Sequence, residues 1–155
     1  MKIVTTLVES DPVCMNLVSH SAVYTALEEC DRQIFLEKGY IAYFDIGEYL
    51  IKEDEIGDKF FILKSGQVEV FTERSGERIT LSILSMGACI GEGSLVTKCR
   101  RTANVQCLTD VMAIVFNFDD IEHIIDRNEK AKKLLISLIE RRADSTVERI
   151  LSCLD

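Results

Sequence analysis

Residues 40–116 restrict the fold more than any other part of this chain, because short apolar runs alternate there with glycine-containing turns. The stretches QVEVF (67–71) and ITLSI (79–83) alternate apolar and polar side chains, as a strand does when it buries one face. Short strands at this even spacing predict an antiparallel sandwich or a jelly-roll barrel and argue against a parallel sheet. The predicted strands cover residues 40–45, 48–51, 59–64, 67–72, 78–84, 101–107 and 111–116.

Helices are expected on both sides of this region. Asp11 followed by Pro12, the chain's single proline, is typical of an N-cap residue with proline at the first helical position. Apolar residues recur at helical spacing up to about residue 38, and a break at 19–21 suits the cap of a second helix. We therefore expect one domain, 1–155, with N-terminal helices in 1–38, a barrel in 39–118 and C-terminal helices in 119–155.

The C-terminal segment is predicted to form a long helix, because residues 119–154 contain neither glycine nor proline. Six positions in it, spaced alternately by three and four residues, lie on one stripe of a helix, as in the seam of a dimeric coiled coil. A helix packed against its own barrel explains the stripe equally well. The positions are 136, 139, 143, 146, 150 and 153.

Composition argues against several kinds of partner and site. The chain has 18 Lys and Arg against 26 Asp and Glu, a net charge of −8 that opposes sequence-independent attraction to nucleic acid or anionic lipid. No stretch is long enough to span a membrane, and the apolar start at residues 3–8 is too short for a secretory leader. Six cysteines without C-x-x-C spacing and only two histidines argue for reduced thiols and against structural zinc. We expect a cytoplasmic protein that contacts neither nucleic acid nor membrane directly.

The stretch IGEGSLVTKCRRTANV, residues 90–105, has the residue types of a site for an anion that also carries hydroxyls. Gly91 and Gly93 flank Glu92, and a short helix beginning near Glu92 would point its N–H groups at an anion. Arg101, nine positions after Glu92, has a guanidinium that donates two parallel hydrogen bonds to a phosphate. Glu92 is suited to accept hydrogen bonds from sugar hydroxyls. Taken singly, a solvated glutamate and a surface arginine are the ordinary alternatives.

This stretch resembles the phosphate-binding cassette of the cyclic nucleotide-binding domain family, which includes catabolite activator proteins and the regulatory domains of cAMP- and cGMP-dependent kinases. Upstream, residues 47–51, 57–63 and 65–70 resemble the family's glycine-marked strands. The resemblance implies an α+β fold: an antiparallel eight-stranded jelly-roll β-barrel flanked by N-terminal helices and a long C-terminal helix. The cassette matches in order and spacing at Gly91, Glu92, Ser94, Leu95, Arg101, Thr102 and Ala103.

The resemblance also implies residue roles. Glu92 would accept the ribose 2′-hydroxyl and Arg101 would bind the exocyclic phosphate oxygens, with backbone amides at 91–94 and 103 completing the anion site. A residue among 135–142 would cover the base. Val70, Ile83 and Leu95 are candidates to pack the sugar and base, although plain barrel core explains each of the three better. The expected ligand-binding set is Gly91, Glu92, Gly93, Ser94, Leu95, Arg101, Thr102, Ala103, Val70 and Ile83.

Two positions depart from the family pattern. Ile90 stands where an aromatic residue is common, a change that a hydrophobic core tolerates. Arg100 stands where a proline is common, and we hypothesise that it adds local positive charge for an anionic ligand. Thr102 resembles the threonine with which cGMP-dependent kinase contacts guanine, but a hydroxyl there is also common in bacterial cAMP receptors. We expect cAMP as the ligand, with a cGMP-selective sensor as the alternative.

We therefore expect a regulatory sensor domain, without catalytic activity or a cofactor, that relays ligand binding through movement of the C-terminal helix. A metal-dependent jelly-roll enzyme would need clustered histidine ligands, and the predicted strands contain no histidine. A dimerisation or interaction module that binds no ligand is the alternative of another class, and the presence of both Glu92 and Arg101 argues against it. The expected partners are a cyclic nucleotide, a second copy through the C-terminal helix, and an output domain or protein outside this chain.

Overall fold

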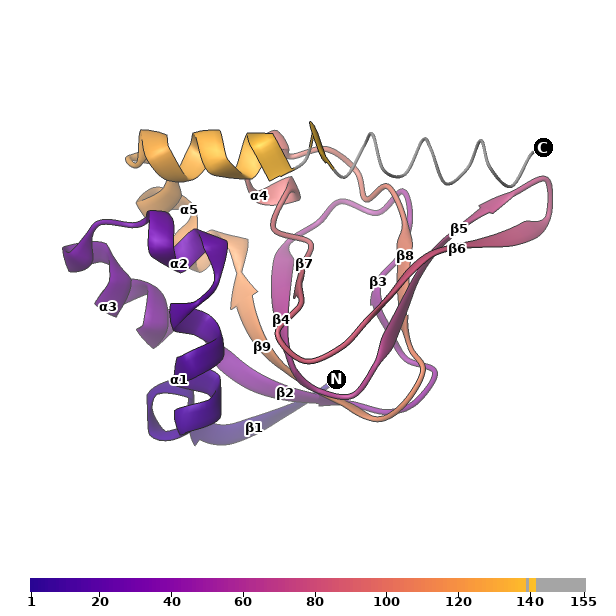
Figure 1. Ribbon diagram of the computed structural model, residues 1–155, viewed down its shortest axis with the longest axis horizontal. Coiled ribbons are helices and arrows are strands. Elements are labelled where there is room, and N and C mark those ends of the chain that lie inside the picture. The colour runs from indigo at the N-terminus through magenta and orange to yellow at the C-terminus, as the bar shows by residue number, and fades with distance from the viewer. Residues whose placement is uncertain (139, 142–155) are drawn as a thin grey trace.

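The computed structural model describes residues 1–138, 140 and 141. Its strands are β1 (Lys2–Leu7), β2 (Tyr40–Phe44), β3 (Tyr49–Ile51), β4 (Lys59–Ser65), β5 (Val68–Arg74), β6 (Glu77–Leu84), β7 (Cys89–Ile90), β8 (Asn104–Cys107) and β9 (Val111–Asn117). They form a five-stranded sheet in the order β1-β2-β9-β4-β7 and a four-stranded sheet in the order β3-β8-β5-β6. All neighbouring strands are antiparallel, and the β5–β6 hairpin extends away from the rest of the molecule (Figure 1).

The predicted α+β jelly-roll class is confirmed by this arrangement, with antiparallel strands throughout and helices on both sides of them in the sequence. The two sheets pack face to face and do not join into one closed barrel. The described residues contain nine strands, one more than the eight expected.

Helices lie between β1 and β2 and after β9, and the predicted long C-terminal helix is interrupted at residues 127–128. Asp11 caps α1 as predicted, because its side chain accepts hydrogen bonds from the N–H groups of Val13 (3.0 Å) and Cys14 (3.3 Å). Ser21 likewise caps α2 by accepting from the N–H of Tyr24 at 3.4 Å. Residues 129–138 are also helical. The bounds are η1 (Val8–Ser10), α1 (Pro12–Ser19), α2 (Ala22–Ala26), α3 (Glu29–Lys38), α4 (Ser94–Thr97) and α5 (Phe118–Asp126).

The assignment of all of residues 1–38 to helices was wrong at its start. Residues 2–7 form β1, which pairs with β2 at the edge of the five-stranded sheet. This stretch, KIVTTL, is rich in β-branched residues, whose side chains pack well on a pleated sheet and lose freedom in a helix. The helical part therefore begins only after this strand.

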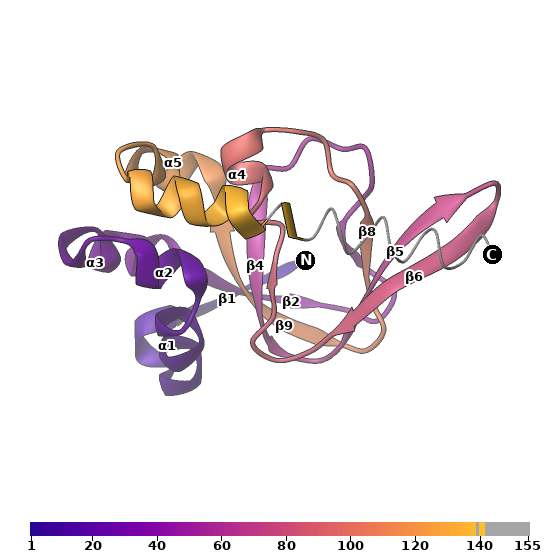
Figure 2. The same ribbon diagram turned by 45° about the horizontal axis from the view of Figure 1, so that its top comes forward.

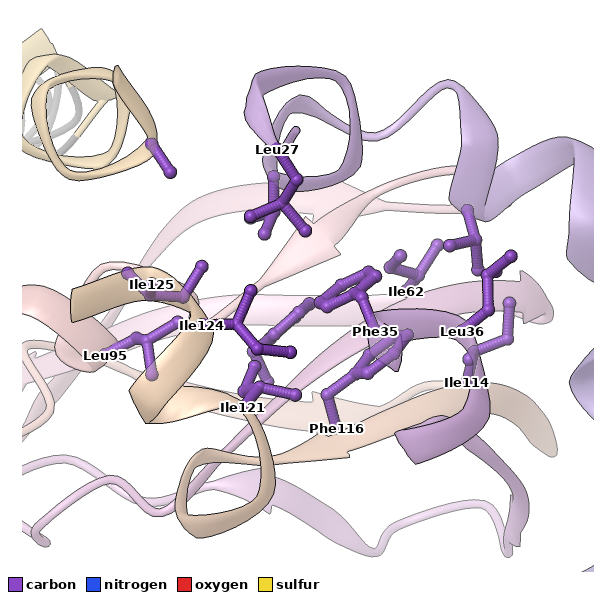
Figure 3. Close-up of a cluster of buried hydrophobic side chains, with 14 of the residues drawn as sticks. Leu27, Phe35, Leu36, Ile62, Leu95, Ile114, Phe116, Ile121, Ile124 and Ile125 are labelled. Atoms are coloured by element: carbon purple, nitrogen blue, oxygen red, sulfur yellow. The ribbon is translucent and has the colours of Figure 1, made fainter. Parts of the chain in front are cut away.

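Side chains on the five-stranded sheet alternate between two cores. Phe60 and Ile62 of β4 point toward the helices, and Phe61 and Leu63 point toward the four-stranded sheet. In both Figure 1 and Figure 2 the helices α1, α2, α3 and α5 lie on one side of this sheet. We call the core beneath them the helical-face cluster; Figure 3 shows its members Leu27, Phe35, Leu36, Ile62, Leu95, Ile114, Phe116, Ile121, Ile124 and Ile125.

The core between the two sheets is called here the inter-sheet cluster. It takes alternate residues of β2, β4 and β9 from one sheet and the inward residues of β3, β5 and β8 from the other. The site described below is built beside this cluster. Its buried members are Ala42, Phe44, Ile51, Phe61, Leu63, Val68, Ile90, Val105, Cys107, Val111, Ala113 and Val115.

Several expectations concern the end of the chain or its composition. Of the six positions in the predicted C-terminal stripe, only Ile136 is among the described residues, and 43% of its surface is exposed. Positions 139, 143, 146, 150 and 153 lie outside them. No helix within the described part is both long and apolar enough to cross a membrane. The five cysteines described are free thiols, and burial raises the pKa of Cys14 and Cys107 to about 11.

Candidate anion-binding site in segment 91–103

The segment 91–103 connects β7 of one sheet to β8 of the other. Gly91 opens it with φ at +86°, a conformation that only glycine adopts without strain. A Cβ at Gly91 would also lie 2.7 Å from Nη1 of Arg101, so glycine is required by space as well as by backbone angle. The predicted short helix is present as α4 and begins at Ser94. It ends where Lys98, with φ at 55°, donates its N–H to the Ser94 carbonyl at 2.9 Å.

The Arg101 side chain is buried in this segment, with only 8% of the residue exposed. Its Nη1 donates hydrogen bonds to the carbonyl of Gly91 (2.8 Å) and the hydroxyl of Ser94 (3.3 Å), and its Nη2 donates to the carbonyl of Lys59. The Phe118 ring, at the start of α5, lies 5.7 Å from its Cζ. Arg101 is thus held by neutral oxygens from Gly91 just after β7, from the first residue of β4 and from α4, and the ordinary surface-arginine explanation is wrong.

Burial lowers the pKa of Arg101, and the nearby negative charges of Asp58 and Glu92 oppose that shift. A guanidinium stays protonated in proteins in spite of such a shift, because its usual pKa lies far above neutral pH. The site therefore holds a permanent positive charge that is largely removed from water. Charges in such surroundings interact more strongly with an oppositely charged ligand than they do at the surface.

Glu92 is buried still more completely, with 2% of the residue exposed. Its carboxylate lies close enough to Arg101 to affect the pKa of the guanidinium, so the structure brings together the two charges that the sequence singled out. The Glu92 carbonyl accepts the Leu95 N–H at 3.1 Å, which ties the residue to the start of α4. A solvated glutamate in a surface turn is thereby excluded.

Segment 52–59, between β3 and β4, forms the opposite wall of the Arg101 side chain. A Cβ at Gly57 would lie only 2.5 Å from Cζ and Nε of Arg101, so the glycine backbone is packed directly against the guanidinium. The Arg101 N–H donates to the Glu55 carbonyl at 2.8 Å, and the Asp54 N–H donates to the Arg101 carbonyl at 2.9 Å. From the sequence, residue 57 was identified only as the start of a glycine-marked strand, and its contact with Arg101 was not predicted.

Leu95 lies in the helical-face cluster, away from the inter-sheet core. It is 3% exposed and belongs to the same buried core as Ile124 and Ile125 of α5, and Figure 3 shows these three side chains close together. The core explanation of Leu95 is thus the one that the structure supports. Its position attaches α4, within the candidate site, to α5.

Val70 and Ile83, the other two apolar candidates, do not share a face. Val70 is half-buried against the inter-sheet cluster and pairs with Ser82 and with the buried Val105. Ile83 pairs with Glu69 on the outward face and is 59% exposed. The structure therefore places Val70 toward the inside and Ile83 away from the site.

A register shift between β5 and β6 explains the position of Ile83. Val70 pairs with Ser82 but Phe71 pairs with Thr80, so β6 carries one extra residue at this point. Uninterrupted alternation along 79–83 would have put Ile83 on the same face as the buried Ile79. After the shift Ser82 occupies the inward position, and sequence alternation alone had no means of finding it.

The remaining predicted residues lie along segment 91–103. Gly93 precedes α4 and is half-buried, as are Ser94 and Ala103, whereas Thr102 is exposed. The Ser94 hydroxyl already accepts a hydrogen bond from Arg101. Thr102 therefore has a hydroxyl at the surface of the site, next to the buried arginine in the chain.

A separate hollow of about 300 Å³ lies next to segment 52–59 but suits an anion poorly. Three of its lining residues are aspartates, at 58, 119 and 120, against a single lysine, Lys59. Within the described residues no group of three or more His, Cys, Asp or Glu side chains is placed to hold a metal ion. The Arg101 surroundings remain the candidate anion site.

Both the sequence and the fold of this chain are similar to those of known proteins. A family model described as the cyclic nucleotide-binding domain matches residues 41–128. Human (Homo sapiens) cGMP-dependent protein kinase 2 is 29% identical over 116 residues, which cover 70% of this chain and 15% of the kinase. The regulatory domain of Toxoplasma gondii PKA, solved with cAMP, has a TM-score of 0.70 at 20% identity and covers 76% of this chain and 44% of its own.

A second solved structure adds a different ligand. The regulatory subunit of a cAMP-independent protein kinase A from Trypanosoma cruzi, bound to guanosine, has a TM-score of 0.69 at 22% identity. The similarity covers 90% of this chain and 48% of that one. This chain thus spans less than half the length of each of the three proteins, and the two structural likenesses show a shared fold.

Proposed function

Because this chain belongs to the cyclic nucleotide-binding domain family, we propose that it is a regulatory sensor domain that binds a 3′,5′-cyclic nucleotide at segment 91–103. The observation that carries this proposal is the burial of Glu92 and Arg101 together in one short segment. In the proposed complex Arg101 binds the phosphate and Glu92 accepts a ribose hydroxyl. Backbone amides at 91–94 and 103 complete the anion site.

The chemistry of Arg101 supports a phosphate ligand. Its hydrogen-bond acceptors are neutral, namely two backbone carbonyls and the Ser94 hydroxyl. Pairing the guanidinium with an ionised phosphate oxygen adds a charge–charge attraction that these neutral acceptors do not supply. A cyclic phosphate that replaces one of these acceptors therefore gains binding energy at a place where water competes little.

The chemistry of Glu92 supports a ligand that is also a hydrogen-bond donor. A carboxylate beside a bound phosphate is repelled by it unless the same ligand supplies a donor group. A ribose 2′-hydroxyl is such a donor. Glu92 and Arg101 together thus suit a molecule that carries both a sugar hydroxyl and a phosphate.

The nucleotide in this proposal is cAMP, with cGMP as the alternative. The exposed Thr102 hydroxyl and the similarity to human cGMP-dependent protein kinase 2 favour cGMP. The T. gondii domain, similar in fold, was solved with cAMP. Because the T. cruzi structure contains guanosine, a binding test of this chain should also include a nucleoside that has no phosphate.

The proposed relay runs from α4 to α5 and the helix that follows. Leu95 of α4 packs in one buried core with Ile124 and Ile125, and Lys98 forms an ion pair with Glu122 of α5. A ligand moves these helices only if it prefers one of their positions over another. In our proposal the phosphate supplies that preference by fixing segment 91–103, and an output domain or a second copy of the chain receives it.

Calorimetric titration with cAMP, cGMP, adenosine and guanosine tests the proposal. At about 0.3 kcal/mol for each of roughly 22 non-hydrogen atoms, a cyclic nucleotide is expected to bind with about 6 to 7 kcal/mol, a Kd of about 10 µM. Arg101→Ala should weaken cyclic nucleotide binding by about 2 to 5 kcal/mol, because the phosphate loses its charged partner. It should weaken nucleoside binding far less.

Arg78→Ala is the matched control. Arg78 stacks on Phe71 and pairs with Glu69 on the outward face of the four-stranded sheet, so its loss removes one positive charge without touching the site. Binding of cAMP or cGMP that survives Arg101→Ala would count against the site. The absence of binding to all four ligands would favour an interaction module instead.

A further inference from the structure

Arg100 has a specific structural partner although its side chain lies at the surface. Its Nη1 donates a hydrogen bond to the backbone carbonyl of Asp54 at 2.8 Å. Its backbone also forms an isolated antiparallel bridge with Ile56. Arg100 is therefore joined to segment 52–59 through both its side chain and its main chain.

Segment 52–59 is the wall that holds Arg101. Gly57 packs against the Arg101 guanidinium, and the Lys59 carbonyl accepts from Nη2. The segment has few other attachments to segment 91–103 and β8: two backbone hydrogen bonds with Arg101, and one from the Glu53 N–H to the Asn104 side chain at 2.9 Å. Lys59 is the first residue of β4 and pairs with Asn117 of β9, so a displacement of residues 52–57 displaces chiefly the Gly57 backbone that packs against the guanidinium.

The Arg100 contact is made at a strained point of the wall. Asp54 has φ at +70°, in the left-handed region that residues other than glycine occupy at a cost. Such a conformation persists only when its surroundings fix it. The Asp54 carbonyl bonded to Arg100 and the Asp54 N–H bonded to the Arg101 carbonyl hold it from both sides.

From these contacts we propose that Arg100 is a positioning residue for ligand binding: its guanidinium clamps residues 52–57 at Asp54, so that the Gly57 backbone holds the Arg101 guanidinium in its place. This inference rests on the proposed function. It is an alternative to the hypothesis that Arg100 attracts the anionic ligand by its charge, and the salt dependence of association distinguishes the two. A proline at this position lacks the side-chain donor that makes the contact.

Arg100→Met tests the clamp, since methionine keeps an unbranched side chain and lacks the donor. The hydrogen bond from the Arg100 guanidinium to the Asp54 carbonyl has a charged donor and lies at the surface, so we expect its loss to lower affinity for the cyclic nucleotide about 3- to 10-fold. The loss should be found in the dissociation rate, and the salt dependence of association should stay as in the wild type. A slower association with a weaker salt dependence would overturn the clamp in favour of charge attraction.

A double-mutant cycle shows whether Arg100 acts through Arg101. In an Arg101→Lys background the fork-shaped guanidinium is gone, so adding Arg100→Met should lower affinity by less than about 2-fold. The same fold loss in both backgrounds would overturn the proposal. Arg100→Lys, which keeps a donor of similar reach, should restore most of the affinity lost in Arg100→Met.

Amide hydrogen exchange tests the clamp independently of any ligand. The N–H groups of Asp54 and Arg101 should exchange several-fold faster in Arg100→Met than in the wild type or Arg100→Lys, because the wall opens more often. Unchanged exchange at both amides would overturn the clamp. If the wild type bound no cyclic nucleotide while exchange behaved as expected, the proposed function would fail and the clamp would remain as a structural contact.

Discussion

The two faces of the five-stranded sheet differ in what they bury, although the same strands build both. On β9, Ile114 and Phe116 face the helices, and Ala113 and Val115 face the other sheet. The helical face is filled by large rings in parallel contact: the centroid of Phe116 lies 4.3 Å from that of Phe35 and 4.9 Å from that of Phe60. The inter-sheet face of the same sheet has the edge-to-face pair Phe44 and Phe61 and otherwise smaller side chains, and it adjoins the site.

The charged residues of the site lie where the two cores meet. Glu92 and Arg101 are both buried. The Arg101 guanidinium lies 5.7 Å from the Phe118 ring of the helical-face cluster, and a Cβ at Gly91 would lie 2.9 Å from Ile51 of the inter-sheet cluster. Burying charges costs free energy unless they are well paired, so this region contributes less to stability than a dry aromatic core of similar size. The stacked aromatic core thus fills one face of the strands, and the charged residues of the site lie outside it, at the border between the two cores.

The largest expected effect is a loss of stability from a substitution on the helical face of the sheet. Phe116→Ala should reduce the free energy of unfolding by about 3 to 5 kcal/mol, because it removes a fully buried ring from the stack and leaves a cavity. Chemical denaturation measures this loss. At a temperature where the variant is still folded, its affinity for the nucleotide should change by less than about 2-fold, since Phe116 faces away from the site.

Val115→Ala is the control on the same strand and the opposite face. Val115 is also fully buried, but alanine removes only two carbons there, about 1.5 kcal/mol of apolar burial before any cavity effect. A Phe116→Ala variant that lost nucleotide binding as severely as Arg101→Ala while still folded would break the division between the faces.

Two glycines give a matched pair of intermediate effect. A Cβ at Gly39 would lie 2.9 Å from the Phe116 ring, and a Cβ at Gly57 would lie 2.5 Å from the Arg101 guanidinium. Neither glycine has a positive φ, so alanine adds a steric contact without backbone strain. Overpacking of this kind costs about 1 to 3 kcal/mol. We expect one substitution to lower chiefly the free energy of unfolding and the other to lower chiefly the affinity for the nucleotide.

Gly39→Ala should lower the free energy of unfolding and leave affinity nearly unchanged, because a ring stacked in a packed core has little room to move. Gly57→Ala should lower affinity for the nucleotide and change stability less, because the guanidinium lies at the end of a flexible side chain and shifts. Denaturation and titration of both variants make the comparison. If the two substitutions lowered the free energy of unfolding equally, Arg101 would be as rigidly packed, and as important for stability, as the Phe116 ring.

The sequence predicted the local features of the fold well. Gly-containing turns and alternation located the strands from β2 to β6 and β8 to β9, and the Asp11–Pro12 pair located the start of α1. It missed β1 and the two-residue β7. The pairing of β1 with β2 joins segments nearly 40 residues apart, and no pattern within residues 2–7 specifies that partner.

The two charged residues of the site were predictable from the sequence, but the groups that surround Arg101 were not. Glu92 and Arg101 were identified because their residue types and spacing are unusual within one short segment. Gly57 and the Lys59 carbonyl come from another loop, and contacts of that kind are set by the packing of the whole domain. Ile83 was displaced to the outer face by a register shift that a single strand's alternation does not reveal.

The smallest expected effect concerns the edge of the helical face, where Asp11 caps α1 and pairs with Lys64 of β4. The hydrogen bond from Lys64 holds the pKa of the Asp11 carboxyl below its usual value. The unfolded chain therefore takes up a proton on this group at a higher pH than the folded chain does. The resulting stabilisation is present above about pH 4 and is lost as the pH falls through the lower pKa of the folded state.

Asp11→Asn separates this charge effect from the cap, because asparagine also accepts hydrogen bonds at an N-cap position. We expect the variant to unfold at a slightly lower temperature than the wild type at neutral pH, and the difference to shrink below about pH 4, where the wild-type carboxyl becomes protonated. Thermal unfolding over a pH series measures this. A difference that stays constant down to about pH 2 would assign the effect to cap geometry instead. Nucleotide affinity at neutral pH should not change, because Lys64 anchors α1 on the face of β4 that recognition does not use.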